Sequence, residues 1–478
     1  MSVRAWIARR WPRPDDILVT DVEGSTLRLR AFLREHSVEL GRVVRRGERT
    51  SFRAFVAAGL LDELRKHAHS AEIVLNASNQ SRTMHQPVLA SARNRFADGQ
   101  LPPGVGHGAP DAAEDYWSLD EVDSALAGLQ QAYPQLSSLI ELPEATAGDQ
   151  RACWALRVGR PSAQPKHVLV VLGGMHGAEW GRCESAVGFA TDLLASTLPG
   201  AGDFHYGQLT FTAVQLDSIL DRMDVVVFPL VNPDGRLYSR QNPGTLWRKN
   251  RSTAHSGGQA AAIGVDLNRN FGFLHDFANA FDASLFGFGV ANATETNYCG
   301  PKPFSEPESR NVRWLLDSLP RARWLIDVHS PWQTVLHPWG DDDAQSDDPD
   351  MTFRNSDYDS LRGIPGDRVP GGNSGYAEYM TAADQAEHDR LAGRIAAAMR
   401  GVGNRPHPHW PGFAIGTFFG TCIDYAFSRH EADPSASQIH AFLLEWGDEL
   451  TVDPPWPTMR GTYMPEVVAG LVQFCLDA

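Results

Sequence analysis

The chain has 478 residues, 42% of them hydrophobic, and a formal net charge of −15. This length allows two or three domains of ~150 residues, or one large domain with an appendage. The acidic balance argues against a nucleic-acid or anionic-membrane partner, because phosphate recognition needs clustered Lys and Arg.

The cysteines and the N-terminus point to a reducing compartment. The five cysteines are scattered and form no Cys-x-x-Cys pair, so we expect neither a disulfide scaffold nor a thiolate zinc site. The N-terminus has no apolar core of the length that a signal peptide needs. No apolar run reaches the ~18 residues of a membrane span. These features predict a cytoplasmic protein.

Residues 1–91 predict a small α+β module, which we call the N-terminal module. The apolar residues switch between a period of 2 and a period of about 3.6 along this block. The predicted order is strand 17–23, helix 25–36, strands 38–44 and 50–56, helix 60–68 and strand 71–78. Residues 92–115 are rich in Gly, Pro, Ala and Asp, which predicts a linker.

Residues 116–478 predict one large α/β domain. Ser118 and Glu121 form a capping-box pattern that predicts the start of a helix. Four short runs are continuously apolar, which is typical of strands buried on both faces of a sheet. These runs are residues 167–174, 224–231, 323–328 and 440–445.

Polar residues with useful chemistry stand at the C-terminal end of each run. His176 and Glu179 follow the first, Asn-Pro-Asp-Gly (232–235) follows the second, His329 follows the third, and Glu445 ends the fourth. Sites in open α/β sheets collect outside the carboxyl ends of the strands. A His-x-x-Glu pair with one distant His suits catalytic zinc, which takes three protein ligands and leaves one position open.

Two further segments carry arginines in turn-like sequences. Leu-Trp-Arg-Lys-Asn-Arg-Ser (246–252) contains Arg248 and Arg251, and Gly-Val-Asp-Leu-Asn-Arg-Asn-Phe (264–271) contains Asn268 and Arg269. A guanidinium held in place suits a carboxylate ligand. A solvated face or a salt-bridged scaffold is the alternative interpretation of such arginines.

Taken together in order, these motifs resemble the zinc metallocarboxypeptidases of the carboxypeptidase A type. The motifs are HGAEW (176–180), NPDG, LWRKNR, GVDLNRNF, SEPE (305–308), His-Ser (329–330) and the glutamate of LLEWG. The resemblance covers roughly residues 116 to 478. It implies a mixed, mostly parallel sheet flanked by helices, one zinc ion, and hydrolysis of C-terminal residues from peptides.

The resemblance also implies roles for individual residues. His176, Glu179 and His329 correspond to the zinc ligands. Glu445 corresponds to the general base, and Arg251 to the group that polarises the scissile carbonyl and stabilises the oxyanion. Asp266 corresponds to the aspartate that accepts a hydrogen bond from the first zinc histidine.

Substrate binding is implied for a second set of residues. Asn268 and Arg269 correspond to the clamp on the terminal carboxylate, with Arg248 nearby. Ile423 corresponds to the base of the specificity pocket, where an apolar residue indicates apolar or aromatic C-terminal side chains.

The chain departs from the family pattern at three positions. Ala178 stands in place of an arginine, Pro331 in place of a tyrosine, and Gly416 in place of the mobile tyrosine that covers the bound terminus. The N-terminal module resembles the family's activation domain in its order of elements, and we expect a permanent lid or an accessory module.

Two alternatives to a carboxypeptidase remain open from the sequence. One is a related zinc hydrolase acting on cell-wall peptides or other amides, which the presence of Asn268 and Arg269 disfavours. The other is an inactive module that binds C-termini without cutting them, which the presence of Glu445 disfavours.

Overall fold

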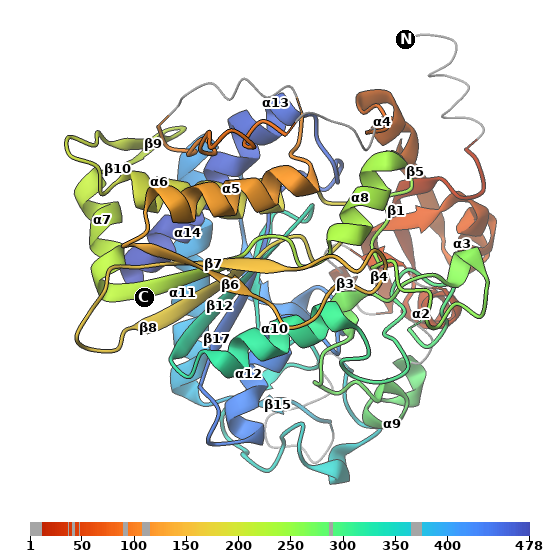
Figure 1. Cartoon of the computed structure of the whole chain (residues 1–478). Coiled ribbons are helices and arrows are strands. Elements are labelled where there is room, and N and C mark those ends of the chain that lie inside the picture. Colours follow the sequence, from red (N-terminus) through yellow and green to blue (C-terminus); the bar gives the residue numbers. More distant parts are fainter. Residues whose placement is uncertain are drawn as a thin grey trace.

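The computed structural model describes residues 12–36, 38–40, 44–46, 48–88, 94–107, 115–285, 290–364 and 375–478. A small N-terminal part lies at one end of a larger α/β body, and the C-terminus lies on the far side of that body (Figure 1). Within the described residues, no helix combines the length and apolar character needed to cross a bilayer.

The N-terminal module folds around an antiparallel sheet with strand order β2-β4-β1-β5, and β3 also pairs with β4. The strands are β1 (Ile17–Ser25), β2 (Glu39–Leu40), β3 (Val44–Arg46), β4 (Arg49–Ala57) and β5 (Ser70–Asn76). The helices are α2 (Thr26–Glu35), α3 (Leu61–His67) and α4 (Ala77–Met84). Leu18, Phe32 and Leu64 form part of the core between the sheet and the helices.

The larger body is built on an eight-stranded sheet with order β16-β13-β17-β12-β8-β11-β7-β6. Its strands are β6 (Ser137–Glu141), β7 (Trp154–Val158), β8 (His167–Leu172), β11 (Met223–Phe228), β12 (Ala322–His329), β13 (Thr334–His337), β16 (His409–Pro411) and β17 (His440–Glu445). The four predicted apolar runs are β8, β11, β12 and β17, which lie together in parallel. The predicted mixed α/β fold is confirmed.

Helices cover both faces of this sheet (Figure 1). One face packs on α5 (Leu119–Ala132), α6 (Arg182–Ala195), α7 (Ala213–Arg222), α11 (Ala382–Gly403) and α14 (Met464–Asp477). The other face packs on α10 (Pro307–Ser318) and α12 (Cys422–Ala432). Leu169 and Val171 belong to the first core, and Val168 and Val170 to the second. Burial on both faces explains why these strands are continuously apolar.

Two of the helices begin with side-chain caps. Asn232 caps the N-terminus of helix α8 (Pro233–Gln241), because its side chain accepts a hydrogen bond from the Gly235 N–H. Helix α5 begins with the predicted capping box between Ser118 and Glu121.

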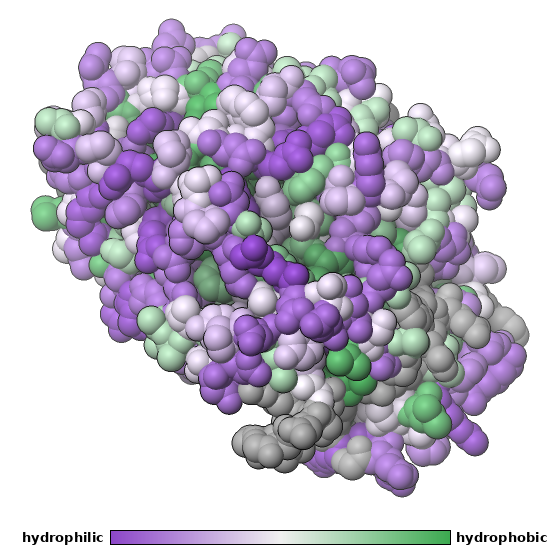
Figure 2. All heavy atoms as spheres, turned by 90° about the horizontal axis from the view of Figure 1, so that it is seen from below, coloured by the Kyte–Doolittle hydropathy of each residue, from purple (hydrophilic) through white to green (hydrophobic). Residues whose placement is uncertain are grey.

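Part of the segment predicted as a linker packs against the α/β body. Phe96 and Val105 are buried in its core. The backbone N–H groups of Val105 and Gly106 donate to the buried carboxylate of Asp192. The apolar residues of this segment are thus buried although they follow no helical or strand period. Hydrogen bonds to its backbone hold the irregular segment in place. The face of the molecule in Figure 2 is predominantly polar, with apolar residues in small, separated patches.

Candidate metal centre and active site

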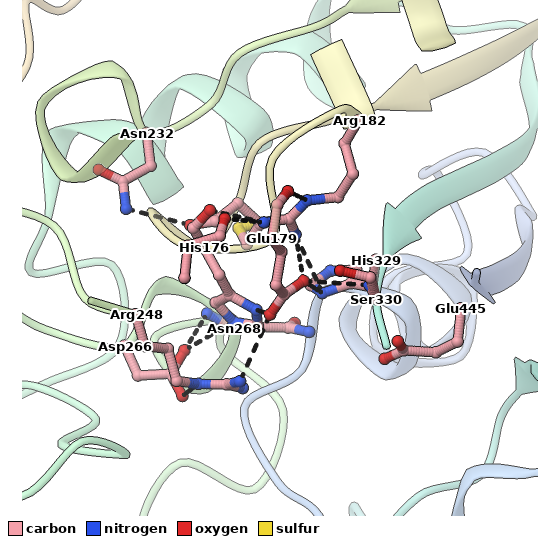
Figure 3. Close-up of polar contacts among 12 residues, drawn as sticks. His176, Glu179, Arg182, Asn232, Arg248, Asp266, Asn268, His329, Ser330 and Glu445 are labelled. Atoms are coloured by element: carbon pink, nitrogen blue, oxygen red, sulfur yellow. Dashed lines mark hydrogen bonds and ion pairs between the residues drawn. The ribbon is translucent and has the colours of Figure 1, made fainter. Parts of the chain in front are cut away.

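Three predicted metal ligands converge at the carboxyl edge of the central sheet. His176 and Glu179 lie on the loop between β8 and α6, and His329 is the last residue of β12. All three are buried, and one donor atom from each lies within 4.8 Å of the others. Glu179 has a left-handed backbone (φ 57°), which turns its side chain toward His176 (Figure 3).

Each histidine is fixed by a carboxylate on its far nitrogen. His176 Nε2 lies 3.2 Å from Asp266 Oδ1, and His329 Nε2 lies 2.9 Å from Asp327 Oδ2. The Nδ1 atoms therefore face Glu179, at 2.8 Å for His176 and 3.4 Å for His329. Two imidazoles backed by carboxylates, with one carboxylate between them, form a donor set that fits catalytic zinc.

Carboxylates and guanidinium groups both surround the site. Burial lowers the pKa of His329, but Asp327 and Glu179 outweigh it and raise the pKa to about 9. Burial alone raises the pKa of Asp266, yet Arg248 and His176 hold that pKa well below its usual range. The carboxylates next to the histidines therefore favour positive charge there, and Arg248 supplies positive charge beside Asp266.

Glu445 stands beside the ligand cluster for a topological reason. It is the last residue of β17 and is in register with His329 on the neighbouring parallel strand β12. Its Oε2 accepts a hydrogen bond from the Trp332 N–H at 3.3 Å. The carboxylate thus has a fixed direction, and it lines the same cavity as His176 and His329.

Arg182 is a site residue that the sequence interpretation missed. It is the first residue of α6, it is fully buried, and its Nη1 lies 2.6 Å from Glu179 Oε2 (Figure 3). The same side chain donates to three carbonyl groups of the 176–179 loop. Arg182 lies only six residues after His176, so its closeness in sequence could have marked it as a candidate site residue. The sequence spacing alone does not predict that the chain turns at Gly181 and directs Arg182 back to the loop.

The two arginines of the 246–252 segment have different surroundings. Arg248 lines the cavity, donates from Nε to Asp266 Oδ2 at 2.8 Å, and places Nη1 3.8 Å from Glu179 Oε1. The Arg251 guanidinium carbon lies 3.7 Å from the centre of the Tyr238 ring and 4.5 Å from that of Trp247. Arg251 is not among the described residues that line the cavity. Among the described contacts, Arg248 is therefore the arginine of this segment that reaches Glu179 and Asp266 of the site.

Asn268 and Arg269 both line the cavity, as a carboxylate clamp would require. Asn268 Oδ1 accepts a hydrogen bond from the Cys422 N–H at 2.8 Å, which leaves its amide N–H₂ as the donor end. Arg269 donates from Nη1 to the Asn268 carbonyl at 2.6 Å, and its guanidinium carbon lies 5.0 Å from the centre of the Phe418 ring.

The cavity has a volume of about 110 Å³ and opens to solvent. Ile423 lies in its wall, together with Leu336, Ile415 and Leu443. The segment around Gly416 also lines it, and the aromatic side chains among the described lining residues are Trp332, Phe418 and Phe419. Among the described cavity-lining residues, the segment around Gly416 contributes the rings of Phe418 and Phe419 and no tyrosine.

The N-terminal module reaches the same cavity. Val38 and Leu40 line it together with residues of the larger α/β body. Behind them, Phe55 packs edge-on against Trp332 with ring centres 5.2 Å apart. Arg53 Nη1 lies 3.3 Å from Glu449 Oε2. One wall of the cavity is therefore built by the module.

The sequence matches the zinc carboxypeptidase family over residues 122–448. It is 28% identical over 296 residues to carboxypeptidase B from Astacus astacus, covering 60% of this chain and 88% of that protein. It is 31% identical over 230 residues to carboxypeptidase A1 from Rattus norvegicus, covering 47% of each. With several of the other curated relatives, the chain spans about half of their length.

Solved structures show the same fold. The structure of thrombin activatable fibrinolysis inhibitor aligns with a TM-score of 0.62 at 18% identity, covering 96% of this chain and 98% of that one. Carboxypeptidase A from Helicoverpa armigera aligns with a TM-score of 0.60 at 16% identity, with the same two coverages.

Because the family match extends over more than half of the sequence, the chain belongs to the zinc carboxypeptidase family. It is a metallocarboxypeptidase, a peptide hydrolase that depends on zinc.

Proposed function

We propose that His176, Glu179 and His329 hold the zinc ion and that peptides lose their C-terminal residues in the adjoining cavity. The observation that carries this proposal is the convergence of the three donors beside Glu445, in the cavity that also contains Asn268 and Arg269. Bound zinc supplies a water of lowered pKa and a Lewis acid for the scissile carbonyl.

Glu445 is the proposed general base. Its register with His329 places it next to the ligand cluster, and the Trp332 N–H fixes its direction. A carboxylate held there accepts a proton from the attacking water and delivers it to the leaving amine.

We assign the oxyanion-stabilising role to Arg248 in place of Arg251. Arg248 lines the cavity, is anchored through Nε to Asp266, and places Nη1 3.8 Å from Glu179 Oε1. A fixed positive charge at that point stabilises negative charge that develops on the carbonyl oxygen. Arg251, stacked on Tyr238, acts as scaffold in this proposal.

Asn268 and Arg269 are proposed to bind the terminal carboxylate of the substrate. Both line the cavity, where Asn268 is held by the Cys422 N–H and Arg269 by the Asn268 carbonyl. An arginine and an amide together select chain ends, because an internal peptide bond presents no carboxylate.

The walls of the cavity support a preference for apolar or aromatic C-terminal side chains. Leu336, Ile415, Ile423 and Leu443 line it, while both oxygens of the buried Asp424 are bonded, to the Gly340 N–H and the Thr421 hydroxyl. Burial also raises the pKa of Asp424 to about 7, which disfavours a charge that would attract Lys or Arg. Hydrolysis rates for peptides ending in Phe, Lys and Asp test this preference, with Phe expected to be fastest.

We propose that residues 1–91 form a module that stays in place and narrows access to the cavity, with 92–115 joining it to a catalytic domain of 116–478. Support comes from Val38 and Leu40 in the cavity wall and from the Phe55–Trp332 contact.

A cytoplasmic location is proposed from the five cysteines, which are all buried and unpaired. Cell fractionation tests the location.

The activity is tested by comparing a blocked peptide that ends in Phe with its C-terminal amide. We expect the free acid to be hydrolysed much faster, and a chelator to abolish hydrolysis until zinc is restored. Equal rates for acid and amide would contradict the carboxylate clamp and favour an amide hydrolase. Zinc binding without hydrolysis would favour a module that only binds C-termini.

A further inference from the structure

The 176–179 loop is fastened by a buried arginine that follows it in the chain. Gly181 has a φ of 101°, a conformation that glycine adopts readily, and it turns the backbone into α6. Arg182, the first residue of that helix, therefore points back at the loop. Its side chain has no solvent exposure.

Most of the contacts of Arg182 are to the backbone of the loop. Nη2 donates to the His176 carbonyl at 2.6 Å and to the Ala178 carbonyl at 2.9 Å. Nε donates to the Glu179 carbonyl at 2.7 Å. These bonds hold both ligand-bearing residues and do not depend on which oxygen of the Glu179 carboxylate faces the metal.

A fourth contact reaches the carboxylate itself. Nη1 lies 2.6 Å from Glu179 Oε2, and the Ser330 N–H donates to the same oxygen at 3.1 Å. Both carboxylate oxygens face the ligand cluster, since Oε1 lies 2.8 Å from His176 Nδ1 and Oε2 lies 3.4 Å from His329 Nδ1. Arg182 Nη1 also lies 3.5 Å from His329 Nδ1. Arg182 thus orients Glu179 as well as the chain that carries it.

Two arginines from different segments contact the Glu179 carboxylate. Arg182 Nη1 lies 2.6 Å from Oε2, and Arg248 Nη1 lies 3.8 Å from Oε1. Arg182 makes the shorter contact and also donates to the carbonyl groups of the loop. Ala178 of the same loop is buried in a cluster with Val19 and Phe55 of the module and with Trp332.

We propose that Arg182 is a positioning residue for zinc binding, which preorganises His176 and Glu179 before the metal arrives. A planar guanidinium suits this role, because one side chain presents several donors in fixed directions. Groups that orient metal ligands typically change metal affinity by about 10- to 100-fold when they are removed. This inference rests on the proposed metal site and adds a residue to it.

The test is zinc affinity, measured by competition with a chelating dye on the full chain. We expect Arg182→Met to weaken zinc binding at least about tenfold. Arg182→Lys is expected to weaken it too, because a lysine keeps a charge for Glu179 but cannot reproduce the set of bonds to the three carbonyls. Arg236→Met is the matched control, since Arg236 is also buried and paired, to Glu184 at 2.5 Å, and its described side-chain hydrogen bonds go to Glu184 and the Trp117 carbonyl rather than to the proposed ligands.

Thermal unfolding of the metal-free proteins separates affinity from general damage. Arg236→Met should lose stability and keep the zinc affinity of the parent protein. Parent-like or tighter zinc binding in both Arg182 variants would overturn the inference, and tighter binding would mean that repulsion between like charges dominates. Failure of the parent protein to bind zinc would instead refute the metal site itself.

Discussion

The Nε2 atom of His329 lies 2.9 Å from Oδ2 of Asp327, two residues earlier on the same strand. Asp327 is fully buried, so its carboxylate holds the imidazole in one orientation, with Nδ1 toward Glu179. Alternate residues of a strand lie on the same face, which places this pair together.

Replacing Asp327 by Asn is therefore expected to weaken zinc binding. The amide keeps the volume of the carboxylate but removes the charge that supports the imidazole, and such changes cost about 10- to 100-fold in metal affinity. Dye competition measures the effect. An unchanged zinc dissociation constant would show that Asp327 does not tune the ligand.

Arg248 and Arg251 form a matched pair three residues apart. Arg248→Met should lower kcat by about 10²- to 10³-fold, the usual effect of losing an oxyanion donor. Arg251→Met should leave kcat little changed, because that side chain stacks on Tyr238 and Trp247 and is not among the described residues that line the cavity. Steady-state kinetics with one free-acid peptide compares kcat for the two variants and the parent protein. The reverse ranking would restore the role to Arg251.

The contact between Phe55 and Trp332 tests the module. Phe55→Ala removes a buried ring at the interface, and losses of this kind cost about 3–5 kcal/mol in a core. We expect a several-fold rise in kcat/KM, because the module holds its place less firmly and the cavity opens. Leu27→Ala, on the exposed side of the same module, is the control and should change nothing. A fall in kcat/KM for Phe55→Ala would indicate that the module supports the site instead.

Asp424 predicts a pH dependence of stability. Burial raises its pKa in the folded protein to about 7, above the ordinary value of 3.8. Between these values the folded state keeps a proton that the unfolded chain has lost. The stability from Asp424 is therefore complete below about pH 4 and is lost as the pH rises through about 7.

Asp424→Asn removes this titration and can keep both partners, since its amide oxygen accepts from the Gly340 N–H and its amide group donates to Thr421. We expect the free energy of unfolding of the variant, relative to that of the parent protein, to increase as the pH rises from about 5 to about 8. Each unit of pKa difference corresponds to about 1.4 kcal/mol, so the gain is at most a few kcal/mol. Urea unfolding at both pH values measures it. A constant difference between the two proteins would contradict the raised pKa.

The four central strands and their carboxyl edge were predictable, because parallel strands buried on both faces have continuously apolar sequences. The same edge argument predicted the convergence of His176, Glu179 and His329, which the structure shows. The period-2 spacing of Asp327 and His329 was also a usable signal, since β12 was already expected to be a strand.

Other features depended on tertiary contacts that no local pattern reports. Which of Arg248 and Arg251 faces the cavity is decided by Asp266 and by the rings of Tyr238 and Trp247, which come from three separate segments. Val105 is held by helix α6, whose Asp192 accepts hydrogen bonds from the backbone N–H groups of Val105 and Gly106, and Phe96 packs edge-on against Trp117. The return of Arg182 to the loop depends on the left-handed turn at Gly181.

The most direct test of the account is anomalous diffraction at the zinc absorption edge from crystals of the full chain. We predict one strong peak bounded by His176, Glu179 and His329, beside Glu445. A peak elsewhere, or none at this position in zinc-loaded crystals, would contradict the assignment of the metal centre.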